Sequence, residues 1–137
     1  MAATPTYAKS VVSVVKTIVN ADSTNWVDVY DNSAGTANVR IEALNLCSDD
    51  TSTVNIAFGS YVGSTTYLMG TVRAVTLSGT DGAAARINCL STVGTVAADG
   101  IPVVEVAAGT KLQAKSLVAV TSAKTVTLTG WGRNFAA

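Results

Sequence analysis

The sequence contains no histidine, and only 13% of its 137 residues are charged. An average soluble domain carries about 25% charged residues. Without histidine, one chain cannot form a Ser-His-Asp or Cys-His catalytic arrangement. Most carboxylates lie in turn motifs, where Asp bonds the backbone, and Glu42 and Glu105 fall at expected outward strand positions. Because no acid–base pair stands out, the sequence predicts that the protein is not an enzyme.

Cysteine is also scarce, with only Cys47 and Cys89, which lie far apart and form no CxxC motif. The usual zinc sites draw on Cys and His, so we expect no metal and no cofactor. The segment "SDDTST" (48–53) leaves a Ca²⁺ loop as an alternative, but it lacks the acidic spacing of an EF-hand, and turn formation explains the same residues. We expect two free thiols, with a Cys47–Cys89 disulfide as the alternative.

Charge and hydropathy show neither a basic patch nor a long apolar run. Nine basic residues balance nine acidic ones, and the basic residues are scattered along the chain. A nucleic-acid groove needs clustered Lys and Arg, and a spanning helix needs about 20 apolar residues. The start, "MAATPTYAK", has neither the basic segment nor the apolar core of a signal peptide. We therefore expect no nucleic-acid or membrane partner, and synthesis in a cytoplasm.

Short segments of alternating hydropathy, separated by turn motifs, fill most of the chain. Val126 and Leu128 alternate with threonines, and Gly63-Ser64 has the composition of a hairpin turn. About seven to nine such segments, spaced as in all-β domains, predict an antiparallel β-sandwich of jelly-roll type. We expect a single domain over residues 9–137, preceded by a short arm over residues 1–8.

Two segments leave their local structure open. In "VRIEALNLCS" (39–48), Val39 and Ile41 share one parity while Leu44 and Leu46 have the other. Either a β-bulge shifts the register there, or the strand is covered on both faces. In "NWVDVYD" (25–31), alternation predicts that the aromatic residues and the first aspartate share one face.

The segment "SVVSVVKTIVNAD" (10–22) fits two structures. Its apolar positions have helical spacing, yet most of its residues are β-branched, which favours a strand. Agreement with the all-β pattern of the rest favours the strand, and a helix over 10–19 is the alternative. As a strand, its valines would be buried on both faces at least in part, and a neighbouring subunit is the simplest cover for the second face.

The aromatic residues are few, and two sets could bind a partner. Trp26 and Tyr30 could form a sugar-binding platform, although packing in the core explains large aromatics equally simply. In "GWGRNFAA" (130–137), Trp131, Arg133 and Phe135 share one parity and belong to types enriched at interfaces. The alternative is that Trp131 and Phe135 close the domain's own core.

Phrases such as "NADSTNW" (20–26) and "AAGTKLQ" (107–113), with the strand segments around them, resemble tailed-phage head decoration (capsid cement) proteins. The similarity is one of strand and turn pattern over nearly the whole chain. It implies a β-sandwich that assembles, commonly as a trimer, on the outside of a phage head. The major capsid protein and further copies of the chain would be its partners, and its location would be the virion.

The resemblance turns the candidate residues into an expected contact surface. We expect Thr4, Pro5 and Tyr7 of the arm, with the polar loops at one end of the sandwich, to face the capsid. The C-terminal set, Trp131, Arg133 and Phe135, is expected to contact the capsid or another subunit. Two other functions remain open: another virion component (tail tube, head completion or fibre), and a carbohydrate-binding module or adhesin.

Overall fold

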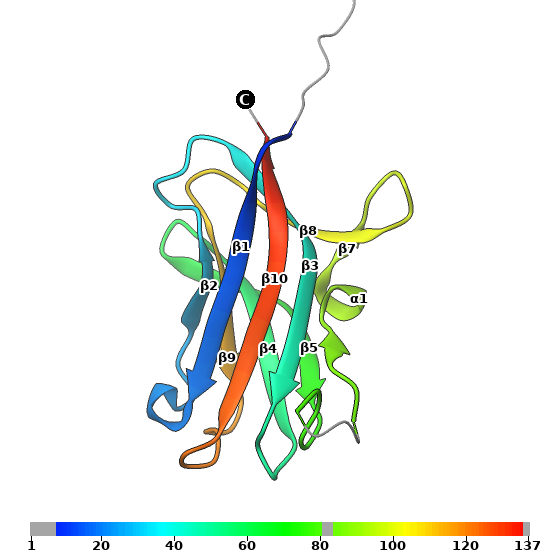
Figure 1. Ribbon diagram of the computed structural model, residues 1–137. Coiled ribbons are helices and arrows are strands. Elements are labelled where there is room, and N and C mark those ends of the chain that lie inside the picture. The colour runs from blue at the N-terminus through cyan, green and yellow to red at the C-terminus, as the bar shows by residue number, and fades with distance from the viewer. Residues whose placement is uncertain (1–7, 81–83, 136–137) are drawn as a thin grey trace, which may run out of the picture.

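The computed structural model describes residues 8–80 and 84–135, and within them the chain forms ten strands and one short α-helix. The strands build a six-stranded and a four-stranded sheet, both antiparallel, which face each other as a sandwich (Figure 1). The predicted all-β sandwich is therefore confirmed. Residues 1–7, which hold most of the predicted arm, lie outside the described residues, and Ala8 already opens the first strand.

The strands have clear bounds in both sheets. The six-stranded sheet contains β1 (Ala8–Val19), β10 (Thr125–Phe135), β3 (Asn38–Ser48), β8 (Pro102–Val106) and the two-residue strands β6 (Ile87–Asn88) and β7 (Thr95–Val96). The four-stranded sheet contains β2 (Val27–Asp31), β9 (Lys111–Ser116), β4 (Val54–Val62) and β5 (Thr65–Ala74). The helix, α1 (Leu90–Val93), is a single turn.

Eight of these strands are five residues or longer, and they pair as one long hairpin rolled into two sheets. The first pairs with the last (β1 with β10), β2 with β9, β3 with β8, and β4 with β5. The resulting orders, β1-β10-β3-β8 and β2-β9-β4-β5, are those of a jelly roll. The eight long strands match the predicted seven to nine, and the two-residue strands β6 and β7 are additions that alternation could not predict.

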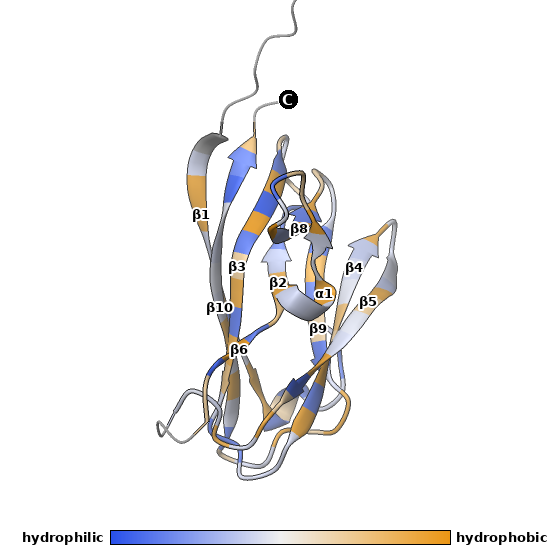
Figure 2. Cartoon of the chain, turned by 90° about the vertical axis from the view of Figure 1, so that its right-hand side faces the viewer, coloured by the Kyte–Doolittle hydropathy of each residue, from blue (hydrophilic) through white to orange (hydrophobic). Residues whose placement is uncertain are grey.

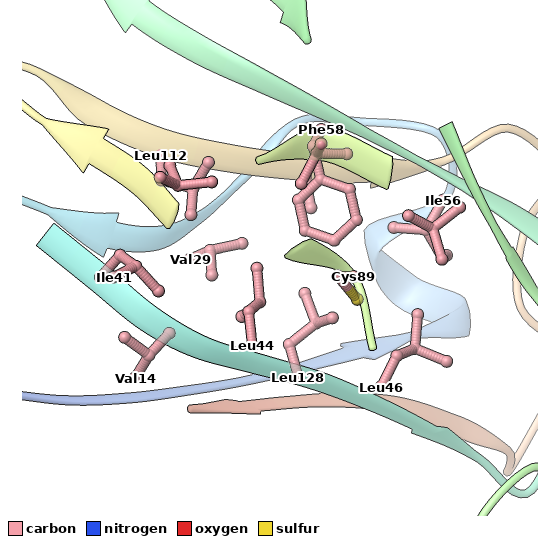
Figure 3. Close-up of a cluster of buried hydrophobic side chains, with 14 of the residues drawn as sticks. Val14, Val29, Ile41, Leu44, Leu46, Ile56, Phe58, Cys89, Leu112 and Leu128 are labelled. Carbon is pink, nitrogen blue, oxygen red and sulfur yellow. The ribbon is translucent and has the colours of Figure 1, made fainter. Parts of the chain in front are cut away.

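The core lies between the sheets and is made of their inward-facing aliphatic side chains (Figure 3). Phe58 is its largest fully buried side chain, and the fully buried Leu44, Leu46, Leu112 and Leu128 belong to the same cluster and come from both sheets. Along the open side of the sandwich, α1 lies between the two sheets and contacts β3, β5 and β8 (Figure 2). Leu90 and Val93 of α1 are buried, so this turn covers the core where the sheets separate.

The segment over residues 10–19 is a strand, which rules out the helical alternative. β1 pairs with β10 along almost its whole length. Val14 and Ile18 point into the core and are buried, whereas Val11 and Val15 on the other face are 69% and 68% exposed. Within one chain the described residues therefore bury only one face of β1, and the expected cover of the second face by a neighbouring subunit stays a prediction.

A β-bulge explains the change of parity in the segment over residues 39–48. Trp131 of β10 pairs with Ala43, but the next residue, Gly132, pairs with Ile41, so Glu42 is an extra residue in β3. A Cβ atom on Gly132 would lie 2.4 Å from the carbonyl oxygen of Arg40, so glycine is required for this close approach. Because of the bulge, both Ile41 and Leu44 face the core.

A second bulge, in β2, corrects the predicted alternation of "NWVDVYD". Asp28 pairs with Gln113, but Tyr30 pairs with the next residue, Leu112, so Val29 is the extra residue. Asp28 consequently faces outward while Tyr30 packs against the core. Alternation from sequence assumes a regular pleat, and one extra residue reverses every face beyond it.

Candidate functional site

The outer surface of the six-stranded sheet carries most of the candidate contact residues. Six outward residues of β1 and β10 form a patch without charged members that we call the valine face: Val11, Ser13, Val15, Thr17, Thr127 and Thr129. Two further outward residues of β10 border it, because Arg133 pairs opposite Val11 and Trp131 pairs opposite Ser13. No member has a titratable side chain, and the two valines are its most exposed apolar groups. Within the described residues, β10 is the only strand that pairs with β1, so the backbone edge of β1 also lies open beside this patch.

Such a patch is unusual for a strand that faces only water. Exposed sheet edges are normally protected by charged side chains, prolines or bulges, because unpaired backbone groups invite pairing with another chain. Here the outward positions carry valines and hydroxyls instead. Burial of these groups would remove no charge from water, so the patch has the chemistry of a contact surface.

Trp131 lies beside the valine face, at the edge of a hollow of about 370 Å³ that we call the Trp131 hollow. Its wall on the sheet side is formed by residues of β3 and β10, and its opposite wall by the turn between β7 and β8. The lining residues are Arg40, Glu42, Ala97, Asp99, Ile101, Val103, Trp131 and Arg133.

The indole of Trp131 is held outward by the backbone around it. Gly130 and Gly132 flank it, and β3 approaches so closely that a Cβ on Gly130 would lie 1.9 Å from the Ala43 carbonyl oxygen. The residues directly opposite Trp131 in the neighbouring strands, Ser13 and Ala43, are small, and the side chain remains 41% exposed. It therefore does not close the core, which was the alternative for this residue.

Two charged residues of the hollow, Arg133 and Glu42, pair with each other, and a third, Arg40, pairs with Glu105 outside it. The Arg133 Nε lies 3.2 Å from a Glu42 carboxylate oxygen, and the Arg133 guanidinium lies 5.6 Å from the centre of the Trp131 ring. The Arg40 Nε donates to Glu105 over 2.7 Å. This hydrogen bond, reinforced by the carboxylate charge, raises the pKa of Arg40. The four charged lining residues, two basic and two acidic, sum to a formal charge of zero.

Phe135 lies outside the Trp131 hollow but lines the adjacent one. This second hollow, of about 430 Å³, shares Arg40 with the first, and the Arg40 guanidinium lies 5.2 Å from the Phe135 ring centre. The three C-terminal candidates therefore share the outer face of β10, as their parity predicted. Thr4, Pro5 and Tyr7 lie outside the described residues.

The outer surface of the four-stranded sheet carries a set of bonded polar groups that we call the polar network: Asp28, Thr66, Lys111 and Gln113. Gln113 donates to Asp28 over 2.8 Å and accepts from Thr66 over 2.7 Å, and Lys111 donates to Asp28 over 3.1 Å. This hydrogen bond to Asp28 is the main cause of a raised pKa for Lys111. Sequence reasoning missed the network because cross-strand register is not encoded in any one segment.

Trp26 of the suggested aromatic platform is half-buried above this sheet. Its ring packs over Gly59, where an added Cβ would lie 3.0 Å from the indole, and the Lys115 Nζ lies 4.7 Å from the ring centre. Because Tyr30 packs against the core, these two aromatics do not share a face, and the platform from Trp26 and Tyr30 is not formed.

The acidic turn "SDDTST" (48–53) forms hydrogen bonds with other parts of the chain. Asp50 is fully buried and accepts hydrogen bonds from the Thr121 backbone N–H (2.9 Å), the Thr121 hydroxyl (2.7 Å) and the Ser52 N–H (2.9 Å). Burial by itself would raise the pKa of Asp50, but these hydrogen bonds outweigh it and lower the pKa below 3.8. The turn thus ties the β3–β4 connection to the segment before β10.

Cys47 and Cys89 are free thiols, and burial raises the pKa of Cys89 to about 12. Among residues 8–80 and 84–135, no three His, Cys, Asp or Glu side chains gather as metal ligands would. No helix in the same ranges has the length and apolar character to cross a membrane.

Comparisons of this chain with protein-family models, with curated proteins and with solved structures find no match. The class that the structure establishes is an all-β jelly-roll sandwich.

Proposed function

We propose that this protein is a capsid decoration protein, which binds the outer surface of a phage head and stabilises the shell. The observation that carries the proposal is the valine face, an uncharged β-branched surface on a long strand at the edge of a rigid sandwich. The pattern resemblance to decoration proteins and the lack of histidine support the same conclusion. The protein would be made in the host cytoplasm and would act on the virion.

The valine face would join copies of the chain, in a trimer as the resemblance implies. Full burial of one exposed valine contributes about 1.5–3 kcal/mol, and Val11 and Val15 would be covered together. The hydroxyl side chains around them can hydrogen-bond across an interface or remain hydrated at its rim. The members of the valine face carry no charge, and Arg133, which lies opposite Val11, is already paired with Glu42, so desolvation offsets only part of this gain.

The capsid would be stabilised by mass action. A protein that binds the assembled shell and not its free subunits shifts the equilibrium toward the shell by its binding free energy. Three linked copies bind with higher avidity than one, without any new contact. The arm residues Thr4, Pro5 and Tyr7, with the polar loops at one end of the sandwich, are the proposed capsid-facing elements.

The test uses the purified chain and heads of the phage that encodes it, stripped of this protein. We expect the chain to sediment with intact heads, to leave dissociated capsid subunits unbound, and to raise the temperature at which the heads release DNA. A variant lacking residues 2–8 should bind fewer sites on the head if the arm faces the capsid. Binding to isolated tails rather than heads would overturn the proposal in favour of a tail component.

A further inference from the structure

The Trp131 hollow has features that self-association does not use. It lies on the β3 side of Trp131, whereas the valine face lies on the β1 side. It is concave, its floor and one wall belong to paired strands, and it is within the size range of small-molecule sites. We propose that the Trp131 hollow is a binding site for a neutral sugar, with a pyranose ring stacked on the Trp131 indole.

The indole supplies the surface on which a sugar would stack. A pyranose ring presents a patch of C–H groups on one face and hydroxyls around its edge, so it suits a flat apolar ring with polar neighbours. Trp131 keeps 41% of its surface exposed, and only the small residues Ser13 and Ala43 lie directly opposite it. The Arg133 guanidinium lies over one face of the ring, 5.6 Å from its centre, so a sugar would stack on the other face.

The charged groups around the indole favour a neutral ligand over an anion. Glu42 and Arg133 form an ion pair, and Arg40 is paired with Glu105, so the charge of each guanidinium is already balanced. Asp99 adds a further carboxylate to the hollow, so a phosphate or carboxylate ligand would meet a net negative charge. Each paired group still has other donors or acceptors, and these can hydrogen-bond hydroxyls at fixed positions.

The wall opposite the indole is a turn with its own internal bonds. Ala97 donates to the Ile101 carbonyl over 3.0 Å, and Asp99 accepts from the Ile101 N–H over 3.1 Å. Gly100 adopts a φ of 84°, which glycine tolerates and which closes the turn. Asp99 retains a second carboxylate oxygen for a ligand hydroxyl, and Ile101, which is 56% exposed, also lines the hollow.

The proposal is independent of the decoration function, but the two combine simply. Single sugars bind protein surfaces weakly, and a dissociation constant near 1 mM corresponds to only about −4 kcal/mol. A surface that carries many copies of the site would bind a polysaccharide far more strongly through avidity. A decorated head would then adhere to sugar-coated surfaces.

The chain contains two tryptophans, so its two indole N–H signals in a ¹H–¹⁵N spectrum provide a site and an internal control. The spectrum of the Trp26→Phe variant lacks the Trp26 signal and so assigns both signals. Methyl glycosides of glucose, galactose, mannose and N-acetylglucosamine are added separately, each to saturating concentration. We expect at least one to shift the Trp131 signal saturably, with a millimolar dissociation constant, and to leave the Trp26 signal in place.

Variants separate stacking from a subunit contact. Trp131→Ala should weaken binding about tenfold or more, and Trp131→Phe should retain part of it. Ile101→Arg changes an exposed position on the opposite wall, so this variant should fold and should block the hollow. It tests the site even if Trp131→Ala does not fold. The proposal is overturned if no glycoside shifts the Trp131 signal, if only Trp26 responds, or if Trp131→Ala lowers the molar mass of the assembly.

Discussion

The two outer surfaces of the sandwich differ in how their groups are engaged. On the four-stranded sheet, the polar network bonds its side chains to one another, and even Gln113, only 8% exposed, has partners for both ends of its amide. On the six-stranded sheet, the valine face leaves two apolar side chains about two-thirds exposed and the edge of β1 open. The first surface is complete within one chain, whereas the second is not.

This difference separates stability from assembly. Groups that bond each other within the chain contribute to the free energy of unfolding, and their loss leaves buried polar atoms without partners. Exposed valines contribute little to folding, and their burial stabilises whatever covers them. Substitutions in the polar network should therefore lower the free energy of unfolding and leave assembly intact, whereas substitutions in the valine face should weaken assembly and leave the fold of each chain stable.

The largest expected effect comes from Val11→Lys combined with Val15→Lys. Two ammonium groups placed in an apolar contact cannot be desolvated cheaply, so self-association should weaken by a factor of about a hundred or more. Light scattering should show assembly for the native chain and a single chain for the variant. The unfolding midpoint of the variant should equal that of the native chain diluted until it no longer assembles. The matched control, Asn55→Lys with Thr71→Lys on exposed positions of β4 and β5, should assemble normally. Equal behaviour of the two variants would remove the valine face from the interface.

Asp28→Ala in the polar network should destabilise the fold and leave assembly intact. It removes the acceptor for both Gln113 and Lys111, and leaves the nearly buried Gln113 amide without its partner. We expect the free energy of unfolding to fall by about 1–3 kcal/mol, measured in urea, with assembly retained. A dissociated variant of normal stability would reverse the assignment of the two surfaces.

Lowering the pH should reduce the stability of the fold without acting on the valine face directly, because the valine face has no titratable group. The lowered pKa of Asp50 means that its contribution to stability is present above its ordinary pKa of 3.8 and is lost as the pH falls through the folded-state value. Unfolding midpoints should therefore decline below about pH 4. Asp50→Asn should cost about 2 kcal/mol at neutral pH and flatten this decline. An unaltered acid dependence in Asp50→Asn would assign the effect to other carboxylates.

Added salt should change the free energy of unfolding less than any of the substitutions above. At about 1 M salt the Debye length falls to about 3 Å, so the half-exposed Lys111–Asp28 pair should lose most of its contribution, which is about 0–1 kcal/mol. Assembly through the valine face should hold or strengthen under the same conditions. Dissociation by salt, measured by light scattering, would show that charged residues rather than Val11 and Val15 join the copies.

The sequence predicted the features that depend on local pattern. The β-branched run over residues 10–19 is β1, the Gly63-Ser64 turn joins β4 to β5 with both residues at positive φ, and the parity change before Leu44 marks a bulge. Each is determined by residues close together in the chain. The parity of Trp131, Arg133 and Phe135 was likewise readable, because β10 is regular on its outward side.

Features that depend on long-range register were not predictable. The Asp28–Gln113 pair joins residues far apart in sequence, and the bulge at Val29 that aims Asp28 outward has no composition signal. The Trp131 hollow needs the turn between β7 and β8 to lie opposite β10, and two-residue strands are too short to show alternation. Glu42 was correctly expected to point outward, but only the bulge places it beside Arg133.

Ala8 pairs with Phe135, so the chain enters and leaves the sandwich side by side at one pole (Figure 1). A passenger peptide joined before Ala8 or after Phe135 would consequently leave the sandwich at the same pole, and a short linker from Phe135 to Ala8 would allow circular permutants opened at the Gly63-Ser64 hairpin. If the scaffold tolerates both, it becomes a display platform whose cargo and whose sites of attachment can be moved independently.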